Sequence, residues 1–291
     1  MKKKIIIYAL SWYGRALYRK LKKQNEEFDI LCFVDADPLK DGTKFDGMQI
    51  RSLEYLTKIN YDEIYVGGRI NKEIIDNLTI NFGIPAHKIV KYTKNDIKLS
   101  TQELSRKHKL IIKILKKINL ASKENNFLYW LDFSSLLAVK RKDLFSEYSD
   151  TDIGVICNDH MEKILLFFSE VKEELNIKIN TSYFNEKTNM VNAGEISKIT
   201  IFNNVKIEDE EPICIDISRK VLYQNKFHQA YNNGKYFVSE KLFFDGQDRV
   251  EIFDIDVPVP LSVDTYLSSI YGENWEIPDL NWQAKNYSNL L

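Results

Sequence analysis

The segment Tyr129–Cys157, YWLDFSSLLAVKRKDLFSEYSDTDIGVIC, carries the most informative pattern in this chain. An apolar strand run ends at Ser134 and Ser135, and the apolar residues directly after them predict a helix. Asp150 and Asp152 then lead into a second apolar run, which predicts another strand. A strand, a helix and a second strand in close succession are typical of an α+β domain built around a small mixed sheet.

Polar side chains stand at both strand ends of this segment. Hydroxyl groups at a helix start can combine with unbonded backbone N–H groups to bind a phosphate oxygen, which makes Ser134 and Ser135 candidate phosphate contacts. Carboxylates two residues apart on a strand project to the same face, so Asp150 and Asp152 are candidate ligands of Mg²⁺ or Mn²⁺. A lone Asp-x-Asp is more often a solvated loop, so the metal-binding interpretation of Asp150 and Asp152 depends on the residues around them.

A third acid, Asp216, stands alone in the apolar strand run Ile213–Ile217. A carboxylate in such a run is costly unless it faces a ligand or an ion. If this strand pairs with the strand after Asp150, the acids meet and form the ligand set of a metal-assisted phosphoryl transfer. The alternative is that Asp216 caps a helix or pairs with Arg219 or Lys220.

These ordered motifs resemble the LicD family of the nucleotidyltransferase fold, which includes bacterial phosphocholine transferases and the fukutin-related proteins. The family's strand, Gly-Ser or Gly-Thr turn, LLGAVR and Asp-x-Asp correspond to WLDFSSLLAVKR and SDTDIGV, and its Val-Asp-Ile corresponds to Ile215–Ile217. The resemblance covers roughly residues 100–280. The family's closing pattern is matched by Pro260, Tyr266, Leu267, Tyr271, Gly272, Trp275 and Pro278.

The resemblance implies a metal-dependent transferase that moves a substituted phosphate group, such as phosphocholine, from a CDP-linked or other nucleotide donor. The acceptor would be a hydroxyl of a surface glycan, as in lipopolysaccharide or capsule biosynthesis. Asp150, Asp152 and Asp216 would then hold Mg²⁺ or Mn²⁺, with Asp216 acting either as a third ligand or as the base. The donor phosphate would contact Ser134 and Ser135, and Lys140 or Arg141 would neutralise its charge.

The sequence departs from the family pattern in three places. Ser134 replaces the turn glycine, Ala138 replaces the glycine inside LLGAVR, and Tyr148 and Ser149 stand where the family has acids. Glycine permits close approach of a phosphate to the backbone, so these changes leave the donor open. Two alternatives therefore remain: a catalytically silent scaffold that binds a nucleotide or nucleotide sugar, and nucleotidyl transfer from an NTP.

Three aromatic residues near the chain end, Tyr271, Trp275 and Trp282, are candidates for stacking on a choline headgroup. Aromatic residues in such a position are more often packing anchors. We therefore favour packing over ligand binding for these side chains.

The first third of the chain alternates apolar runs with amphipathic stretches, which predicts an α/β domain with a parallel sheet. KKKIIIYALSWYGRALYRKL followed by FDILCFVDADP resembles the Rossmann-like domains that precede some sugar-modifying transferases. Of the three fingerprint glycines only Gly14 is present, with Ala9 and Ser11 in the other places. Gly14 and Asp35 are the candidate cofactor-binding residues, because an acid about 20 residues beyond the turn commonly binds ribose. A nucleotide-sugar or architectural role is favoured over redox chemistry.

Charge and composition set further bounds. The 291 residues carry a formal net charge of −1, which argues against a dedicated nucleic-acid binder. The polar segment Lys91–Ser100 predicts a domain boundary. We therefore expect a Rossmann-like α/β domain over residues 1–98 and an α+β domain of the nucleotidyltransferase fold over residues 99–291.

The cysteines and the apolar runs bear on the location of the protein. Cys32, Cys157 and Cys214 each lie in an apolar run without CxxC spacing, which is typical of reduced core thiols in a cytoplasmic protein. We find no uninterrupted apolar run long enough to cross a bilayer, so no transmembrane segment is expected. The three thiols therefore predict a cytoplasmic protein.

Overall fold

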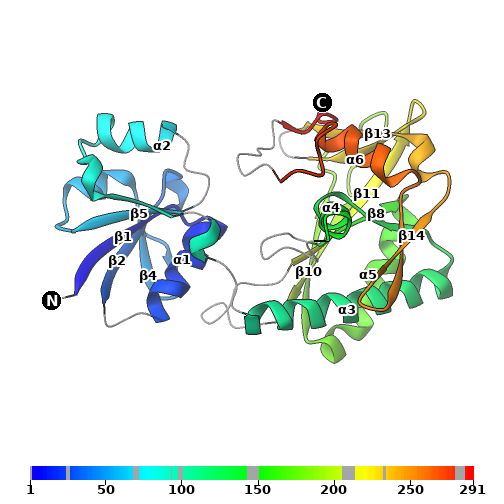
Figure 1. The fold of residues 1–291 in the computed structure, drawn as a ribbon, viewed down its shortest axis with the longest axis horizontal. Coiled ribbons are helices and arrows are strands. Elements are labelled where there is room, and N and C mark those ends of the chain that lie inside the picture. Colours follow the sequence, from blue (N-terminus) through cyan, green and yellow to red (C-terminus); the bar gives the residue numbers. More distant parts are fainter. Residues whose placement is uncertain are drawn as a thin grey trace. The chain divides into compact units, whose positions relative to one another are not determined.

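The computed structural model describes residues 2–23, 27–67, 72–92, 94–97, 101–142, 151–204, 214–231, 234–278 and 286–291. The chain divides into two compact units, the first ending at Leu99 and the second beginning at Ser100 (Figure 1). This division falls one residue from the boundary expected after residue 98. Asp150 and Trp282, which the sequence singled out, lie outside the described residues.

The first unit is built on a six-stranded sheet in the order β3-β4-β2-β1-β5-β6. The pairs along the path from β4 to β6 are parallel, and β3 pairs antiparallel with β4. The strands are β1 (Lys3–Tyr8), β2 (Phe28–Val34), β3 (Lys44–Phe45), β4 (Met48–Arg51), β5 (Glu63–Gly67) and β6 (Ile89–Tyr92). The α-helices are α1 (Trp12–Lys23) and α2 (Lys72–Asp76). A π-helical segment, η3 (Asn77–Asn81), follows α2, and the 3₁₀ turns are η1 (Pro38–Lys40), η2 (Leu53–Thr57), η4 (Ala86–Lys88) and η5 (Lys94–Ile97).

Both faces of this sheet are buried, as continuous apolar strands predict. On β1, Ile5 and Ile7 pack in one apolar cluster with Leu17 and Leu21 of α1. Ile6 and Tyr8 belong to a second cluster, which contains Leu53, Leu56 and Leu78 from η2 and η3. The predicted α/β sheet with parallel strands is therefore confirmed.

The second unit contains a seven-stranded mixed sheet. One path runs β13-β12-β11-β10-β9, while β8 pairs parallel with β11 and antiparallel with β7. Its strands are β7 (Tyr129–Leu131), β8 (Thr151–Ile156), β9 (Ile177–Tyr183), β10 (Ile196–Asn203), β11 (Cys214–Tyr223), β12 (Lys226–Ala230) and β13 (Tyr236–Glu240), and β14 (Asp248–Ile252) and β15 (Ile255–Val259) form a separate hairpin. The helices are α3 (Thr101–Asn125), α4 (Phe133–Lys140), α5 (Asn158–Leu175) and α6 (Val263–Tyr271), with the turn η7 (Lys241–Phe244).

The two faces of this sheet differ in character. Ile153, Ile199, Ile201, Ile215 and Ile217 are almost completely buried and lie on one face, which packs with α5 in the larger apolar core. The other face carries Asp152 and Asp216 and is approached by α4, which contacts β8 (Figure 1). The acid-bearing face is where a polar ligand can be bound.

Helix α3 spans 25 residues, and its apolar stripe of Leu110, Ile111, Ile114, Leu115 and Ile118 is buried, as predicted. Lysines interrupt its apolar residues throughout. Among the described residues, no helix combines the length and the apolar character needed to cross a bilayer.

Candidate functional site

The acids of the sequence motif can meet only if the strand of Asp216 pairs with the strand of Asp152, and the structure contains this pairing. β8 and β11 are parallel neighbours, and Asp152 lies opposite Asp216 in their register. Side chains of register partners project to the same face, and neighbouring strands lie about 4.8 Å apart. The two carboxylates therefore stand side by side on the face that α4 approaches.

Ser134 and Ser135 connect the start of α4 to Asp152. The Ser134 hydroxyl and backbone N–H donate to Asp152 Oδ2, at 2.5 Å and 3.2 Å. Ser135 is completely buried, and its Oγ accepts a hydrogen bond of 2.6 Å from the Asp152 backbone N–H. In this arrangement Ser134 orients the carboxylate and Ser135 holds the backbone of β8. Their predicted contact with a donor phosphate stays a prediction.

At the start of α4, the residue with an unusual backbone conformation is not the one that the family pattern leads one to expect. The residue with positive φ is Phe133 (φ 40°), one position before the serine that replaces the family's glycine. A bulky residue in this region is strained by about 1–3 kcal/mol unless its surroundings hold it. Phe133 is buried, and its ring packs 4.8 Å from that of Phe237. Packing rather than glycine therefore maintains the turn.

Asp216 lies in the interior of β11, so its interpretation as a helix cap is wrong. Thr200 on β10 donates to Asp216 Oδ1 at 2.7 Å, and Lys198 Nζ lies 3.2 Å from Oδ2. Arg219 instead pairs with Glu195, at 2.6 Å, and Lys220 pairs with Asp132. The neighbours that follow Asp216 in the sequence are thus not its partners.

The basic residues at the end of α4 are held by other groups. Lys140 Nζ lies 2.6 Å from Asp264 Oδ1. Arg141 donates to the backbone carbonyl oxygens of Trp275 and Ile277, which ties the segment after α6 to α4. Neutralisation of the donor phosphate's charge by Lys140 or Arg141 stays a prediction, and it requires either residue to change its partner.

A buried ionic cluster that the sequence did not predict lies beneath the start of α4. Lys220 Nζ lies 2.7 Å from Asp132 Oδ2, and the two side chains are 2% and 1% exposed. Asp132 also accepts hydrogen bonds from the Phe133 N–H and from the Tyr266 hydroxyl. Burial and the adjacent Asp132 carboxylate raise the pKa of Tyr266 well above its ordinary value, so its hydroxyl remains a donor. Because Asp132 directly precedes the Ser134 turn, this cluster anchors the turn.

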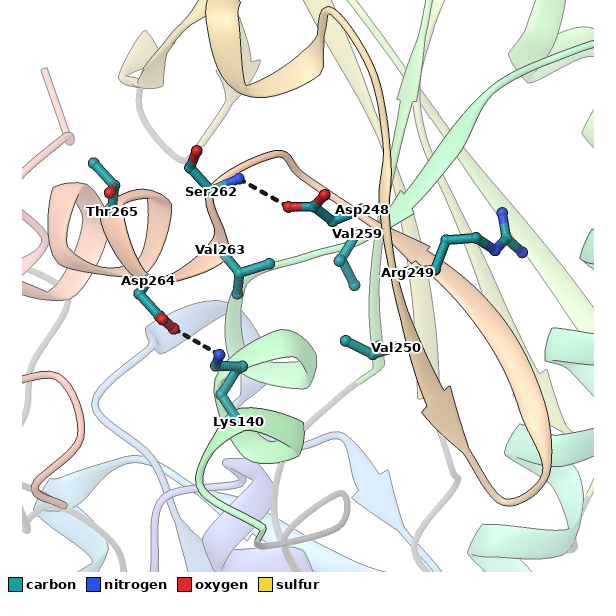
Figure 2. Close-up of a pocket in the computed structure, with 9 residues that line it drawn as sticks. All are labelled: Lys140, Asp248, Arg249, Val250, Val259, Ser262, Val263, Asp264 and Thr265. Carbon is teal, nitrogen blue, oxygen red and sulfur yellow. Dashed lines mark hydrogen bonds and ion pairs between the residues drawn. The ribbon is translucent and has the colours of Figure 1, made fainter.

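An open pocket of about 460 Å³ lies beside the end of α4 (Figure 2). Its walls are Lys140, Asp248, Arg249, Val250, Val259, Ser262, Val263, Asp264 and Thr265. The Lys140–Asp264 ion pair lies between α4 and α6, and Asp248 Oδ2 accepts the Ser262 N–H at 3.0 Å. None of the predicted site residues except Lys140 lines it.

The aromatic residues Tyr271 and Trp275 are 9% and 6% exposed and belong to the main apolar core. The packing interpretation is confirmed for both, and neither presents a ring face to a choline headgroup in this arrangement. Among the described residues, which exclude Asp150, no group of three His, Cys, Asp or Glu side chains could hold a metal ion.

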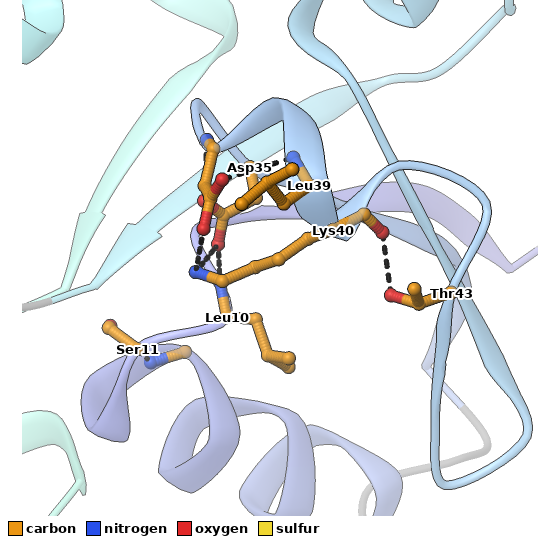
Figure 3. A network of polar contacts seen from close by, with 8 residues as sticks. Leu10, Ser11, Asp35, Leu39, Lys40 and Thr43 are labelled. Carbon is orange, nitrogen blue, oxygen red and sulfur yellow. Dashed lines mark hydrogen bonds and ion pairs between the residues drawn. The ribbon is translucent and has the colours of Figure 1, made fainter.

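In the first unit, Asp35 follows β2 and connects two loops (Figure 3). Its Oδ2 accepts hydrogen bonds from the Leu10 N–H at 2.8 Å and from Lys40 Nζ at 3.0 Å, and its Oδ1 accepts the Asp37 N–H at 3.0 Å. Burial alone would raise the pKa of Asp35, but these donors outweigh it and the pKa lies below its ordinary value. Asp35 is thus a structural carboxylate here, and ribose binding by it stays a prediction.

Gly14 lies where the turn after β1 passes close to α1. A Cβ atom at this position would lie 2.0 Å from the Ala9 carbonyl oxygen, so no other residue fits without moving the backbone. Ser11 Oγ accepts the Gly14 N–H at 3.3 Å. The glycine serves close packing of this turn, and cofactor binding by it stays a prediction.

Replacing Asp35 with asparagine should destabilise the first unit by about 2 kcal/mol at pH 7, because a buried acceptor with charged and backbone donors is weakened. Since the folded-state pKa is lowered, the contribution of Asp35 is complete above the ordinary value of 3.8 and is lost as pH falls through the folded-state pKa. The stability difference between wild type and variant should therefore shrink below about pH 4. Urea unfolding followed by the NMR amide signals of β1 and β2 measures it.

The matched control for this prediction is Asp37→Asn. The Asp37 side chain is 43% exposed and 3.9 Å from Lys40, so its replacement should cost less than about 1 kcal/mol. A difference for Asp35→Asn that stays constant from pH 7 to about pH 2 would contradict the assigned network.

A family model described as "C2185-like, N-terminal" matches residues 1–90, which lie in the first unit. No curated protein matches the chain in sequence.

Several solved structures are similar to parts of the chain. UDP-D-quinovosamine 4-dehydrogenase from Vibrio fischeri is 19% identical over 36% of this chain and 85% of its own, with a TM-score of 0.26. The lincomycin-bound lincosamide antibiotic adenylyltransferase LnuA is 18% identical over 56% and 81%, with a TM-score of 0.31. RSP, a Rex-family repressor, is 17% identical over 43% and 64%, with a TM-score of 0.27. At these TM-scores the likenesses carry no argument about the site or the activity.

Proposed function

We propose that the second unit has the nucleotidyltransferase fold and is a metal-dependent transferase that moves a substituted phosphate group from a nucleotide-linked donor to a glycan hydroxyl. The observation that carries the proposal is the register of Asp152 and Asp216 on one face, with the Ser134 turn bonded to Asp152. This arrangement agrees with what the resemblance to the LicD family implies. Phosphocholine as the group, a lipopolysaccharide or capsule precursor as acceptor and a cytoplasmic location are parts of the same proposal.

The residues present fit a divalent cation. Mg²⁺ is commonly bound by one or two carboxylates together with substrate phosphates, and Asp152 and Asp216 supply two carboxylates on neighbouring strands. Asp150, the third ligand of the proposal, lies outside the described residues. A bound Mg²⁺ or Mn²⁺ would supply positive charge against the transferring phosphate.

The chain's own groups would orient the reaction. The Ser134 hydroxyl donates to Oδ2 of Asp152 and so fixes the plane of this carboxylate. The position of the second oxygen, Oδ1, is thereby fixed as well. Thr200 does the same for Asp216 through Oδ1. Asp216 would either bind the cation or accept the proton of the attacking hydroxyl. Positioning and charge stabilisation carry most of the catalysis in phosphoryl transfer.

Thermal-shift titration tests the proposal with CDP-choline, other CDP-alcohols, nucleotide sugars and NTPs, each with and without Mg²⁺. Binding to the folded state raises the melting temperature by mass action. A Mg²⁺-dependent shift with a CDP-alcohol should be lost in Asp152→Asn and in Asp216→Asn. It should persist in Asp159→Asn, which changes an exposed acid on α5. A shift that survives both site variants would refute the assigned site.

A second candidate is a nucleotide-binding scaffold without turnover. The observation that favours it is the ion pair of Asp216 with Lys198, because a carboxylate neutralised by an ammonium group is a weaker metal ligand. Binding of CDP-choline with no release of CMP during long incubation with a glycan acceptor would support this candidate. Release of pyrophosphate from CTP or ATP would instead indicate nucleotidyl transfer.

A further inference from the structure

The proposed site needs a cation for the donor phosphate, and α4 does not present one. Lys140 lies six positions after Ser134, which is about 9 Å along a helix. The Lys140 ammonium is paired with Asp264, and the Arg141 guanidinium is bonded to the carbonyl oxygens of Trp275 and Ile277. Both cations therefore serve the contact between α4 and the C-terminal part of the second unit.

Lys198 lies on the correct face instead. It pairs with Ser218 in the antiparallel register of β10 and β11, and the next pair on the same face is Thr200 with Asp216. Its Nζ lies 3.2 Å from Asp216 Oδ2, and its side chain is 41% exposed. The ammonium group therefore reaches Asp216 and remains accessible to a dissolved ligand.

The partner of Lys198 can be exchanged at little cost. Ion pairs that solvent reaches are worth about 0–1 kcal/mol, whereas a bidentate or charge-assisted bond to phosphate is stronger. Asp216 also cannot give the same oxygen to a divalent cation and to Lys198. A ligand that brings both a cation and a phosphate therefore separates this pair and leaves the Lys198 ammonium for a phosphate oxygen.

Other lysines of the second unit suit this role less well. Lys220 is on the same face but is 2% exposed and paired with Asp132. Lys178 is exposed on β9, where it pairs with Phe202, two strands away from Asp216. On β9, Asn180 and Ser182 are exposed on the same face as Lys198. The surface from Lys198 to β9 is thus polar and open.

We propose that Lys198 is the residue that binds the donor's phosphate at the Asp152–Asp216 pair, so that the phosphate lies over β10 and β11 and the rest of the donor extends over β9. This assignment rests on the proposed function of the second unit. It makes Lys198, rather than Lys140 or Arg141, the group that offsets the negative charge of a nucleoside diphosphate. Removal of Lys198 should weaken phosphate binding without weakening the metal site.

Isothermal titration of the full chain with CDP and with cytidine, both in Mg²⁺, tests the proposal. Lys198→Ala and Lys198→Gln should each raise the Kd of CDP about tenfold or more, the expected loss for a hydrogen bond between charged groups. Cytidine, which has no phosphate, should bind these variants as it binds wild type. Lys172→Ala, the matched control, removes an exposed lysine of α5, which packs on the opposite face of the sheet, so it should change the Kd of CDP by less than about twofold.

Titration with Mn²⁺ alone, followed by electron paramagnetic resonance, separates this proposal from the proposed function. Lys198→Ala should bind Mn²⁺ at least as tightly as wild type, because Asp216 loses a competing ammonium, whereas Asp216→Asn should lose Mn²⁺. Wild-type affinity for CDP in both Lys198 variants, with Mn²⁺ binding intact, would overturn the role of Lys198 alone. Absence of both CDP and Mn²⁺ binding in wild type would overturn the proposed function and this inference together.

Discussion

Lys220→Met should lower the free energy of unfolding of the second unit by about 3–5 kcal/mol, the range for removing one partner of a buried ion pair. The variant leaves the Asp132 carboxylate 1% exposed and without its counter-charge at 2.7 Å. It also removes the ammonium that lies 4.9 Å from the Phe244 ring and 5.1 Å from the Phe133 ring. Urea unfolding followed by hydrogen exchange of β8 and β11 peptides measures the loss in this unit separately from the first.

Two comparisons identify the cause of that loss. Lys226 and Glu240 form an ion pair of 2.8 Å in which both side chains are about half exposed. Lys226→Met should therefore lower the free energy of unfolding by less than about 1 kcal/mol. The double variant Lys220→Met/Asp132→Asn removes the uncompensated charge while asparagine can still cap α4, so it should recover much of the stability. If the double variant loses as much stability as Lys220→Met and Asp132→Asn lose together, the buried pair is not the source of the effect.

The strands of the acid pair could be predicted because their information is local. The first halves of β8 and β11 each carry one acid among mostly apolar residues, and the two acids fall at equivalent places. Pairing these runs brings Asp152 beside Asp216, and the structure has this register. A pattern that recurs within one strand is visible without knowledge of the fold.

The ionic cluster and the partners of the basic residues could not be predicted in this way. Asp132 and Lys220 are 88 positions apart in the chain, and a lysine beside an arginine in a strand normally points to solvent. Its burial is decided by the rings of Phe133 and Phe244, which come from two other elements. The same reason applies to Arg141, whose carbonyl partners lie more than 130 positions later.

Two strands of the second unit, β9 and β12, have weak local signals in the sequence. β9 and β12 alternate polar and apolar residues over short spans, and their polar faces are exposed. Lys198 on β10 was overlooked for a related reason, since one lysine in a β-branched run carries no sign of what it faces. Only the register with β11 brings it beside Asp216. The pairing of β10 with β11 thus brings Lys198 to the site, which the Asp-x-Asp motif alone does not predict.

Gly154→Ala should destabilise the second unit by about 2–4 kcal/mol, because the Lys220 and Asp132 side chains fill the space beside Gly154. Gly154 lies in β8 between the acid pair and the buried ion pair, and its backbone has no positive φ that would require glycine. An added Cβ would lie 2.7 Å from Lys220 Cε and 2.9 Å from Asp132 Oδ2. Hydrogen exchange of the β8 and β11 peptides in urea measures the loss.

A mutant cycle shows whether that loss comes from the close approach to Lys220. In Lys220→Ala the side-chain carbons nearest to Gly154 are absent, so adding Gly154→Ala should cost at least about 1 kcal/mol less than it does in wild type. Gly67→Ala on β5 is the control, because its Cβ would meet Tyr13 at an ordinary 3.4 Å. That change should be neutral or slightly stabilising, since alanine restricts the unfolded chain. Equal costs for Gly154→Ala in both backgrounds would show that the strand, and not the ion pair above it, requires glycine.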